Sequence, residues 1–163
     1  LTRNGKIVKV IKKDAWYLNS VYPKIIHPFV LGATYCDYQN YMFGGLFLYN
    51  KYWFTTQVAD KYTILSSEFY GTKKIIGTSF IFKKVKPELL YGWKQKMING
   101  IYVRIMTPER AFIEYCRENK SKIGTLQEIY QQKIDKTLFK KILNTYPYKN
   151  ITMFIQKEIL SCT

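Results

Sequence analysis

The chain has 163 residues, 47% of them apolar, and its 26 Lys and Arg against 11 Asp and Glu give a formal net charge of +15. This length suits one domain of ordinary size, or one domain with an appendage, and the composition excludes disordered, collagen-like and low-complexity chains. The longest uncharged run, residues 38–50, is too short and too polar to cross a bilayer, so we expect no membrane partner. An excess of lysine permits polyanion binding, and it is equally compatible with lysine as a solubilising residue.

The cysteines and the amino terminus bear on the cellular compartment. Cys36, Cys116 and Cys162 are odd in number and form no CxxC pair, which predicts a reducing compartment without a disulfide framework. No secretory signal is recognisable at the amino terminus, so we expect a cytoplasmic protein. Because the chain opens with Leu1 and runs at once into a strand-like pattern, we also expect residues to be missing upstream.

The first third of the chain predicts a hairpin followed by a helix. Residues 6–18 alternate β-branched and polar side chains around a polar turn at residues 12–14, which is typical of a β-hairpin. Pro28 disfavours helix immediately before it, so we expect a helix from about residue 29 to residue 43. The aromatic stretch at residues 46–54 should be largely buried.

The middle of the chain predicts a small mixed sheet. Residues 61–66, 78–85 and 101–105 are rich in β-branched and aromatic residues and are bounded by Gly, Pro or the turn dipeptide at residues 99–100. These segments are therefore expected to be strands of one sheet.

A helix start follows this sheet. Thr107 is suited to cap a helix, Pro108 to occupy its first position and Glu109 to favour the helix dipole. The residues of its apolar face are Ala111, Phe112, Tyr115 and Cys116. The residues expected to face solvent are Glu114, Arg117 and Glu118.

Three further helices are expected in the tail. Thr125 and Glu128 have the spacing of a capping box, which predicts a helix from there to about residue 133. Asp135 should cap another helix that Pro147 stops, and a last helix is expected over residues 150–160. The fold class predicted is α/β in the broad sense (α+β), a small mixed sheet surrounded by helices.

The sequence contains no motif that favours an enzymatic function. His27 is the single histidine, no spacing favours a metal site and no glycine-rich phosphate loop is present, so we expect no catalytic residue, metal or cofactor. The alternative is a metal-dependent nuclease, which requires Asp60, Glu68 and a lysine to converge around a divalent cation. A protein-binding module whose charge only solubilises it is a third possibility.

Several segments, in this order, resemble the AbiEi family of type IV toxin–antitoxin antitoxins. The segments that carry the resemblance are Gly5–Val10 with Trp16 and Tyr17, Ala59–Leu65, the basic strand with its Lys-Pro-Glu-Leu element at Phe80–Gly92, and the strand that runs into a Pro-Glu-Arg-Ala helix at Val103–Glu114. The resemblance extends from the basic hairpin to about residue 118.

The resemblance implies two parts for this chain. Residues 1–19 would be the remnant wing of a winged helix-turn-helix whose recognition helix lies before Leu1. Residues 20–163 would be the antitoxin domain, with its sheet and helices to about residue 118 and a helical tail over residues 119–163. The implied function is that of a non-catalytic antitoxin and transcriptional autorepressor in abortive infection of phage-infected cells. Its implied partners are promoter DNA and a cognate nucleotidyltransferase-type toxin, and the oligomeric state is left open.

The distribution of charge along the chain indicates candidate DNA-binding residues. Basic residues exceed acidic ones by +4 over residues 1–20 and by +7 over residues 71–110. The candidate DNA-binding residues are Arg3, Lys6, Lys9, Lys12, Lys13, Lys73, Lys74, Lys83, Lys84 and Lys86. The start of the helix at Thr107, Glu109 and Arg110 is either a partner contact or a structural cap in which Arg110 pairs with a nearby carboxylate, and local physics favours the cap.

Overall fold

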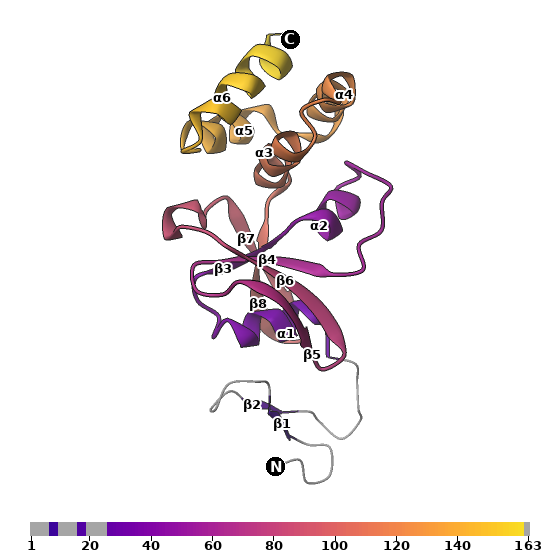
Figure 1. Ribbon diagram of the computed structural model, residues 1–163, viewed down its shortest axis with the longest axis vertical. Coiled ribbons are helices and arrows are strands. Elements are labelled where there is room, and N and C mark those ends of the chain that lie inside the picture. The colour runs from indigo at the N-terminus through magenta and orange to yellow at the C-terminus, as the bar shows by residue number, and fades with distance from the viewer. Residues whose placement is uncertain (1–6, 10–15, 19–25, 162–163) are drawn as a thin grey trace.

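In the computed structural model, residues 7–9, 16–18 and 26–161 are described. They form a six-stranded mixed sheet with helices on two sides, which confirms the predicted α+β class. Figure 1 shows helix α1 on one side of the sheet and the carboxy-terminal helices on the other. The helices are α1 (Pro28–Tyr35), α2 (Leu46–Lys51), α3 (Pro108–Glu118), α4 (Ile123–Lys133), α5 (Lys136–Asn144) and α6 (Lys149–Ile155), and a π-helical turn, η2 (Gln156–Leu160), continues α6.

The expected amino-terminal hairpin is present as two short strands. β1 (Ile7–Lys9) pairs antiparallel with β2 (Trp16–Leu18), so that Val8 lies opposite Tyr17. The turn expected at residues 12–14 lies outside the described residues. The assignment of this hairpin to a wing therefore stays a prediction.

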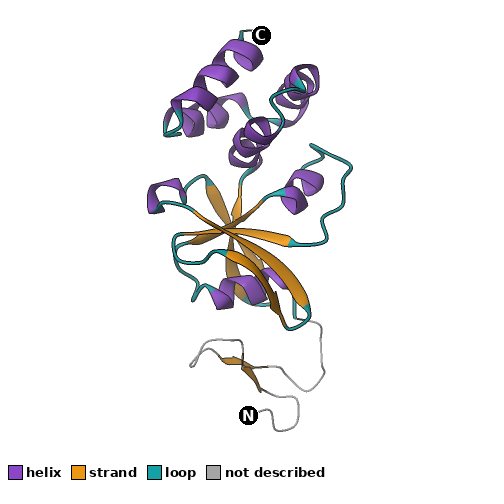
Figure 2. Cartoon of the chain, viewed as in Figure 1, coloured by secondary structure: helices purple, strands orange, loops and turns teal. Residues whose placement is uncertain are grey.

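The strands of the large sheet, orange in Figure 2, have the order β5-β6-β4-β3-β8-β7. Its strands are β3 (Tyr41–Gly44), β4 (Tyr62–Ser66), β5 (Gly71–Ile75), β6 (Thr78–Lys84), β7 (Trp93–Ile98) and β8 (Ile101–Met106). The expected strands at 61–66, 78–85 and 101–105 are confirmed as β4, β6 and β8. The pairs β3–β8 and β4–β6 are parallel, whereas the neighbouring pairs β3–β4, β5–β6 and β7–β8 are antiparallel.

The helix expected over residues 29–43 is wrong in its second half. α1 ends at Tyr35, and Asp37 and Tyr38 then take left-handed backbone angles, with φ of 50° and 58°. Residues 41–44 form β3, a central strand that is buried along its whole length. A strand with neighbours on both sides and both faces covered lacks the polar alternation that marks an exposed strand, so its sequence cannot be distinguished from a helix by period alone.

The sequence analysis also missed β7 and α2. β7 (Trp93–Ile98) is an edge strand with mostly exposed, polar side chains, and its pairing with β8 through the turn at Asn99 and Gly100 holds it in place. α2 lies within the aromatic stretch at residues 46–54. That stretch is largely buried as expected, but Trp53 is 77% exposed.

The helix starts in the tail were predicted with mixed success. Asp135 caps α5 as expected, because its Oδ1 accepts a hydrogen bond from the backbone N–H of Leu138 at 2.9 Å. The capping box at Thr125 is wrong, since α4 already begins at Ile123 and its cap residue, Lys122, makes no side-chain capping bond. The last expected helix, over residues 150–160, is confirmed as α6 and η2.

Two aromatic clusters hold the layers together. Between α1 and the sheet, the rings of Phe29 and Phe43 lie 4.4 Å apart. A Cβ at Gly32 of α1 would lie 2.6 Å from Ile64 Cδ1, so a larger residue there would require the neighbouring side chains to shift. In the helical layer, Phe112 is fully buried among the rings of Phe54, Tyr130 and Phe139. Each such burial contributes about 1.5–3 kcal/mol.

Candidate functional site

The start of α3 is built into the interior of the protein. Thr107 Oγ1 accepts a hydrogen bond from the backbone N–H of Arg110 at 3.3 Å, which confirms the predicted cap. Glu109 and Arg110 are only 5% and 0% exposed, so neither side chain is presented to a partner. The geometry therefore favours the structural interpretation of this segment.

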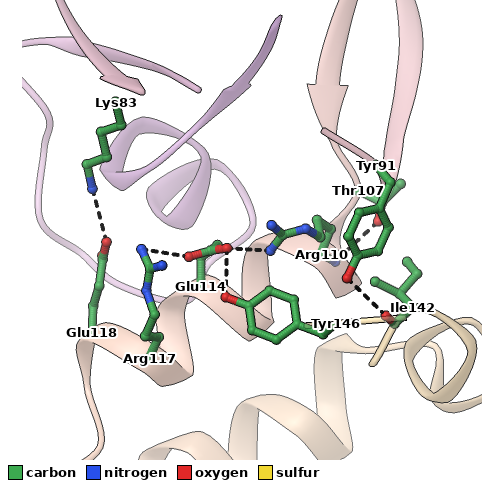
Figure 3. Close-up of polar contacts among 9 residues, drawn as sticks. All are labelled: Lys83, Tyr91, Thr107, Arg110, Glu114, Arg117, Glu118, Ile142 and Tyr146. Carbon is green, nitrogen blue, oxygen red and sulfur yellow. Dashed lines mark hydrogen bonds and ion pairs between the residues drawn. The ribbon is translucent and has the colours of Figure 1, made fainter. Parts of the chain in front are cut away.

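Glu114 is the centre of an ion-pair network on α3 (Figure 3). Arg110 Nη1 lies 2.6 Å from Glu114 Oε1, Arg117 Nη2 lies 2.8 Å from Glu114 Oε2, and the Tyr146 hydroxyl donates to Glu114 Oε1 at 3.1 Å. The expectation that Glu114 faces solvent is wrong, because this side chain is only 6% exposed. The helical tail covers its face of α3 and supplies Tyr146, so two hydrogen-bond donors, Arg110 and Tyr146, and the nearby charge of Arg117 compensate for the burial of the carboxylate.

Two tyrosine rings enclose the Arg110 guanidinium. Its central carbon lies 5.2 Å from the centroid of Tyr91 and 5.0 Å from that of Tyr146, within the range of cation–π attraction. The Tyr91 hydroxyl donates to the backbone carbonyl of Ile142 in α5 at 3.3 Å. Burial, and next the negative charge of Glu114, raise the pKa of Tyr146, so its hydroxyl stays a protonated donor.

Gly92 permits the sheet to reach this network. Its φ is +69°, and a Cβ there would lie 2.9 Å from the Cβ of Arg110. The Gly92 carbonyl accepts a hydrogen bond from the backbone N–H of Thr107 at 2.9 Å. The residue before β7 and the cap of α3 are thereby held together, which fixes the direction in which Arg110 enters the interior.

A cavity of about 220 Å³ lies beside this network, between the sheet and α3. At its edge, Lys83 Nζ of β6 lies 3.2 Å from Glu118 Oε1 of α3, with both side chains partly exposed. The lining residues that bear charge are Lys83, Lys84, Arg110, Glu114, Arg117 and Glu118. Four cations against two carboxylates leave the wall of this cavity positively charged.

The described candidate DNA-binding lysines do not form one surface. On β5, Lys74 is exposed, whereas Lys73 points to the α1 side and lies 5.8 Å from the centroid of the Tyr35 ring. At the end of β6, Lys83 and Lys84 line the cavity, and Lys86 lies 3.8 Å from Glu88. Lys9 lies on β1, and its side chain is outside the described part of the chain. Arg3, Lys6, Lys12 and Lys13 are also outside the described residues.

The sequence analysis missed a second group of basic residues at the opposite edge of the sheet. Lys94 and Lys96 of β7 lie two positions apart and so share a face, and Lys51 of α2 is near them. All three are exposed, and among the described residues no carboxylate pairs with them. Burial, and then the charges of Lys96 and Lys94, lower the pKa of Lys51. The Lys-x-Lys spacing at residues 94–96 indicates two lysines on one face only if the segment is a strand. The sequence analysis did not recognise β7 as a strand, so it did not find this group.

The acids of the nuclease alternative do not converge. Asp60 precedes β4 and pairs with Lys61 at 3.9 Å, whereas Glu68 follows the same strand. A strand rises about 3.3 Å per residue, so the two carboxylates stand at opposite ends of β4. In the part of the chain that the structure describes, no three His, Cys, Asp or Glu side chains are grouped as metal ligands.

His27 has a structural contact. Its Nδ1 accepts a hydrogen bond from the backbone N–H of Phe29 at 3.2 Å, so it caps α1. Burial, and then the positive charges of Lys96 and Lys51, lower the pKa of this imidazole. Its neutral form therefore keeps Nδ1 available as an acceptor.

No family model matches the sequence, and no curated protein matches it significantly. Among the described helices, none combines the length and apolar character that a membrane crossing requires.

Proposed function

We propose that this chain is a non-catalytic antitoxin and transcriptional autorepressor of a type IV toxin–antitoxin system. It binds promoter DNA through its lysine-rich edges and acts in the cytoplasm. In this proposal residues 1–19 belong to the wing of a winged-helix unit, and the rest of the chain forms the antitoxin domain that opposes a nucleotidyltransferase toxin.

The observation that carries the DNA-binding part is the placement of exposed lysines on both edges of the sheet. Lys74 lies on the edge strand β5, and Lys94 and Lys96 lie on the other edge strand, β7. Lysines without carboxylate partners are available to displace counterions from phosphates, which is the main source of non-specific affinity for DNA. The formal charge of +15 adds attraction at longer range.

The antitoxin part is supported by the order of the segments that resemble the AbiEi family. The Lys-Pro-Glu-Leu element at residues 86–89 follows β6, and the Pro-Glu-Arg-Ala element at residues 108–111 begins α3 directly after β8. Each element is thus separated by one residue from the end of a strand of the large sheet and lies where the chain leaves the sheet for a helical turn. A buried, structural role for the second element leaves the toxin-opposing surface elsewhere on the domain.

The DNA-binding part is tested by fluorescence anisotropy with a labelled duplex at several salt concentrations. We expect the affinity to fall steeply with salt, and the double variant Lys94→Gln/Lys96→Gln to reduce the slope of log K against log salt by about two, since each phosphate contact contributes roughly 0.9. The matched control is Lys133→Gln/Lys140→Gln, which removes two exposed charges from the helical tail. Affinity independent of salt, or an equal loss in the control, would contradict the proposal.

The antitoxin part is tested in cells. The chain is co-expressed with the nucleotidyltransferase encoded in its own operon, and growth is compared with that of cells expressing the nucleotidyltransferase alone. We expect restored growth. Growth arrest in both cultures, with the chain present in soluble form, would overturn this part and leave the DNA-binding part to be judged by its own measurement.

A further inference from the structure

The cavity beside α3 has the charge and the donors of an anion site. Arg117 lines the cavity with its side chain 38% exposed, and Lys84 is an exposed lining residue that forms no ion pair within the described part of the chain. Two neutral hydroxyl groups, those of Tyr49 and Thr63, line the same space. Burial, and next the charges of Glu118 and Glu114, raise the pKa of Tyr49 well above its usual value, so its hydroxyl stays protonated, and it hydrogen-bonds with Glu118.

A buried polar atom without a partner supports this interpretation. The Arg110 side chain is 1% exposed and lines the cavity, yet its Nε has no hydrogen-bond acceptor. Buried N–H groups of arginine are nearly always satisfied, because desolvating a donor without a partner costs free energy. The carboxylates in the wall are paired with cations: Glu114 with Arg110 and Arg117, and Glu118 with Lys83. Glu114 Oε2 lies 2.8 Å from Arg117 Nη2 but, like Glu109 Oε2, makes no hydrogen bond.

We propose that this cavity binds a small oxyanion, either free phosphate or the phosphate group of a mononucleotide, between Arg117 and Lys84. A volume of about 220 Å³ is below the usual range for drug-sized ligands and is ample for a phosphate group. Lysine and arginine are the side chains that bind phosphate most strongly in proteins, through charge-assisted hydrogen bonds. A larger ligand would place its remaining part at the open edge near Lys83 and Glu118.

This inference does not rest on the proposed function. It concerns a cavity between layers of the fold, whereas DNA binding is assigned to the sheet edges. An anion site here would remain if the chain bound no DNA, and DNA binding at β7 would remain if the cavity stayed empty.

The test is isothermal titration calorimetry of the full chain with inorganic phosphate and, separately, with adenosine monophosphate, in chloride buffer of constant ionic strength. We expect saturable binding of at least one of the two, and the pair of titrations distinguishes free phosphate from a nucleotide. Arg117→Gln should weaken binding by about tenfold or more, since a charge-assisted hydrogen bond is lost. Glu114 keeps Arg110 and Tyr146 as partners in this variant, so the fold is expected to persist.

Two comparisons make the result decisive. Lys84→Gln should weaken binding by a similar factor, whereas Lys140→Gln, which removes one exposed charge from α5, should leave the affinity within about twofold. Folding of each variant is checked by circular dichroism. The proposal is overturned if neither ligand binds at concentrations up to about ten millimolar. A dissociation constant above that value corresponds to a binding free energy weaker than about −3 kcal/mol. It is also overturned if Lys140→Gln weakens binding as much as Arg117→Gln, because attraction would then come from net charge alone.

Discussion

The start of α3 and the edge strand β7 are both rich in charge, yet they use it in opposite ways. Arg110 and Glu114 are withdrawn from solvent and form an ion pair with one another, and Arg117 and Tyr146 also contact the Glu114 carboxylate. Lys94 and Lys96 are exposed, and no carboxylate of the described residues forms an ion pair with them. The comparison teaches that a charged residue acquires its role from its burial and its partner. Four predictions sharpen this contrast, beginning with the largest effect.

Removing the carboxylate at the centre of the network should be the most damaging change. Glu114→Ala leaves Arg110 buried and uncompensated, so we expect the free energy of unfolding to fall by about 3–5 kcal/mol. Urea denaturation measures this loss. Glu118→Ala, which removes a partly exposed carboxylate from the same helix, should cost no more than about 1 kcal/mol. Equal losses in the two variants would refute the buried network.

Alkaline pH should weaken the same region through Tyr52. Its hydroxyl donates to the Met106 carbonyl at 2.6 Å, directly before α3. Burial, and then the negative charge of Glu109, raise its pKa to about 12. The unfolded chain ionises tyrosine near pH 10, so the stabilisation is complete below that pH and is lost as the pH rises from about 10 to 12.

The measurement for Tyr52 is the free energy of unfolding against pH. We expect it to decline above pH 10, and to decline less steeply in Tyr52→Phe, which lacks the ionising group. Tyr41, whose pKa burial also raises to about 12, ionises in the same range and should account for part of the remaining decline. A variant with the slope of the wild type would show that Tyr52 is not responsible.

The cap of α3 should have a smaller effect. Thr107→Ala removes the acceptor for the Arg110 backbone N–H, so we expect a loss of about 1 kcal/mol. Thr107→Ser keeps the oxygen and should be nearly neutral. Thermal unfolding of the wild type and the two variants measures their relative stability. If the serine variant were as unstable as the alanine variant, the stabilisation would come from the threonine methyl group rather than from its hydroxyl.

The exposed lysines should have the smallest effect on stability. Lys74→Gln and Lys96→Gln should each change the free energy of unfolding by less than about 0.5 kcal/mol, because neither side chain has a carboxylate partner in the described residues. The same urea titration provides the comparison with Glu114→Ala. A loss of free energy of unfolding as large as that of Glu114→Ala would show that these lysines, like Arg110, make interactions on which the fold depends.

Local signals were enough for elements whose identity depends on a few neighbouring residues. The caps at Thr107 and Asp135 were predictable because a short polar side chain needs only the N–H group three residues ahead. Strands with an apolar face, such as β6 (Thr78–Lys84), were predictable from composition and period. The failure at β3 has the opposite cause, since a central strand is defined by the neighbours that cover it.

The sequence by itself therefore determined the charge, the fold class, the starts of α3 and α5, and the presence of a candidate ion pair at Arg110. Only the tertiary structure decided which carboxylate receives that arginine and that Glu114 is buried. It also decided that Lys83 and Lys84 come to the cavity rather than to a common surface with Lys74. The physical reason is that these features depend on contacts between residues distant in the chain, such as Glu114 with Tyr146 and Lys83 with Glu118, which no local pattern encodes.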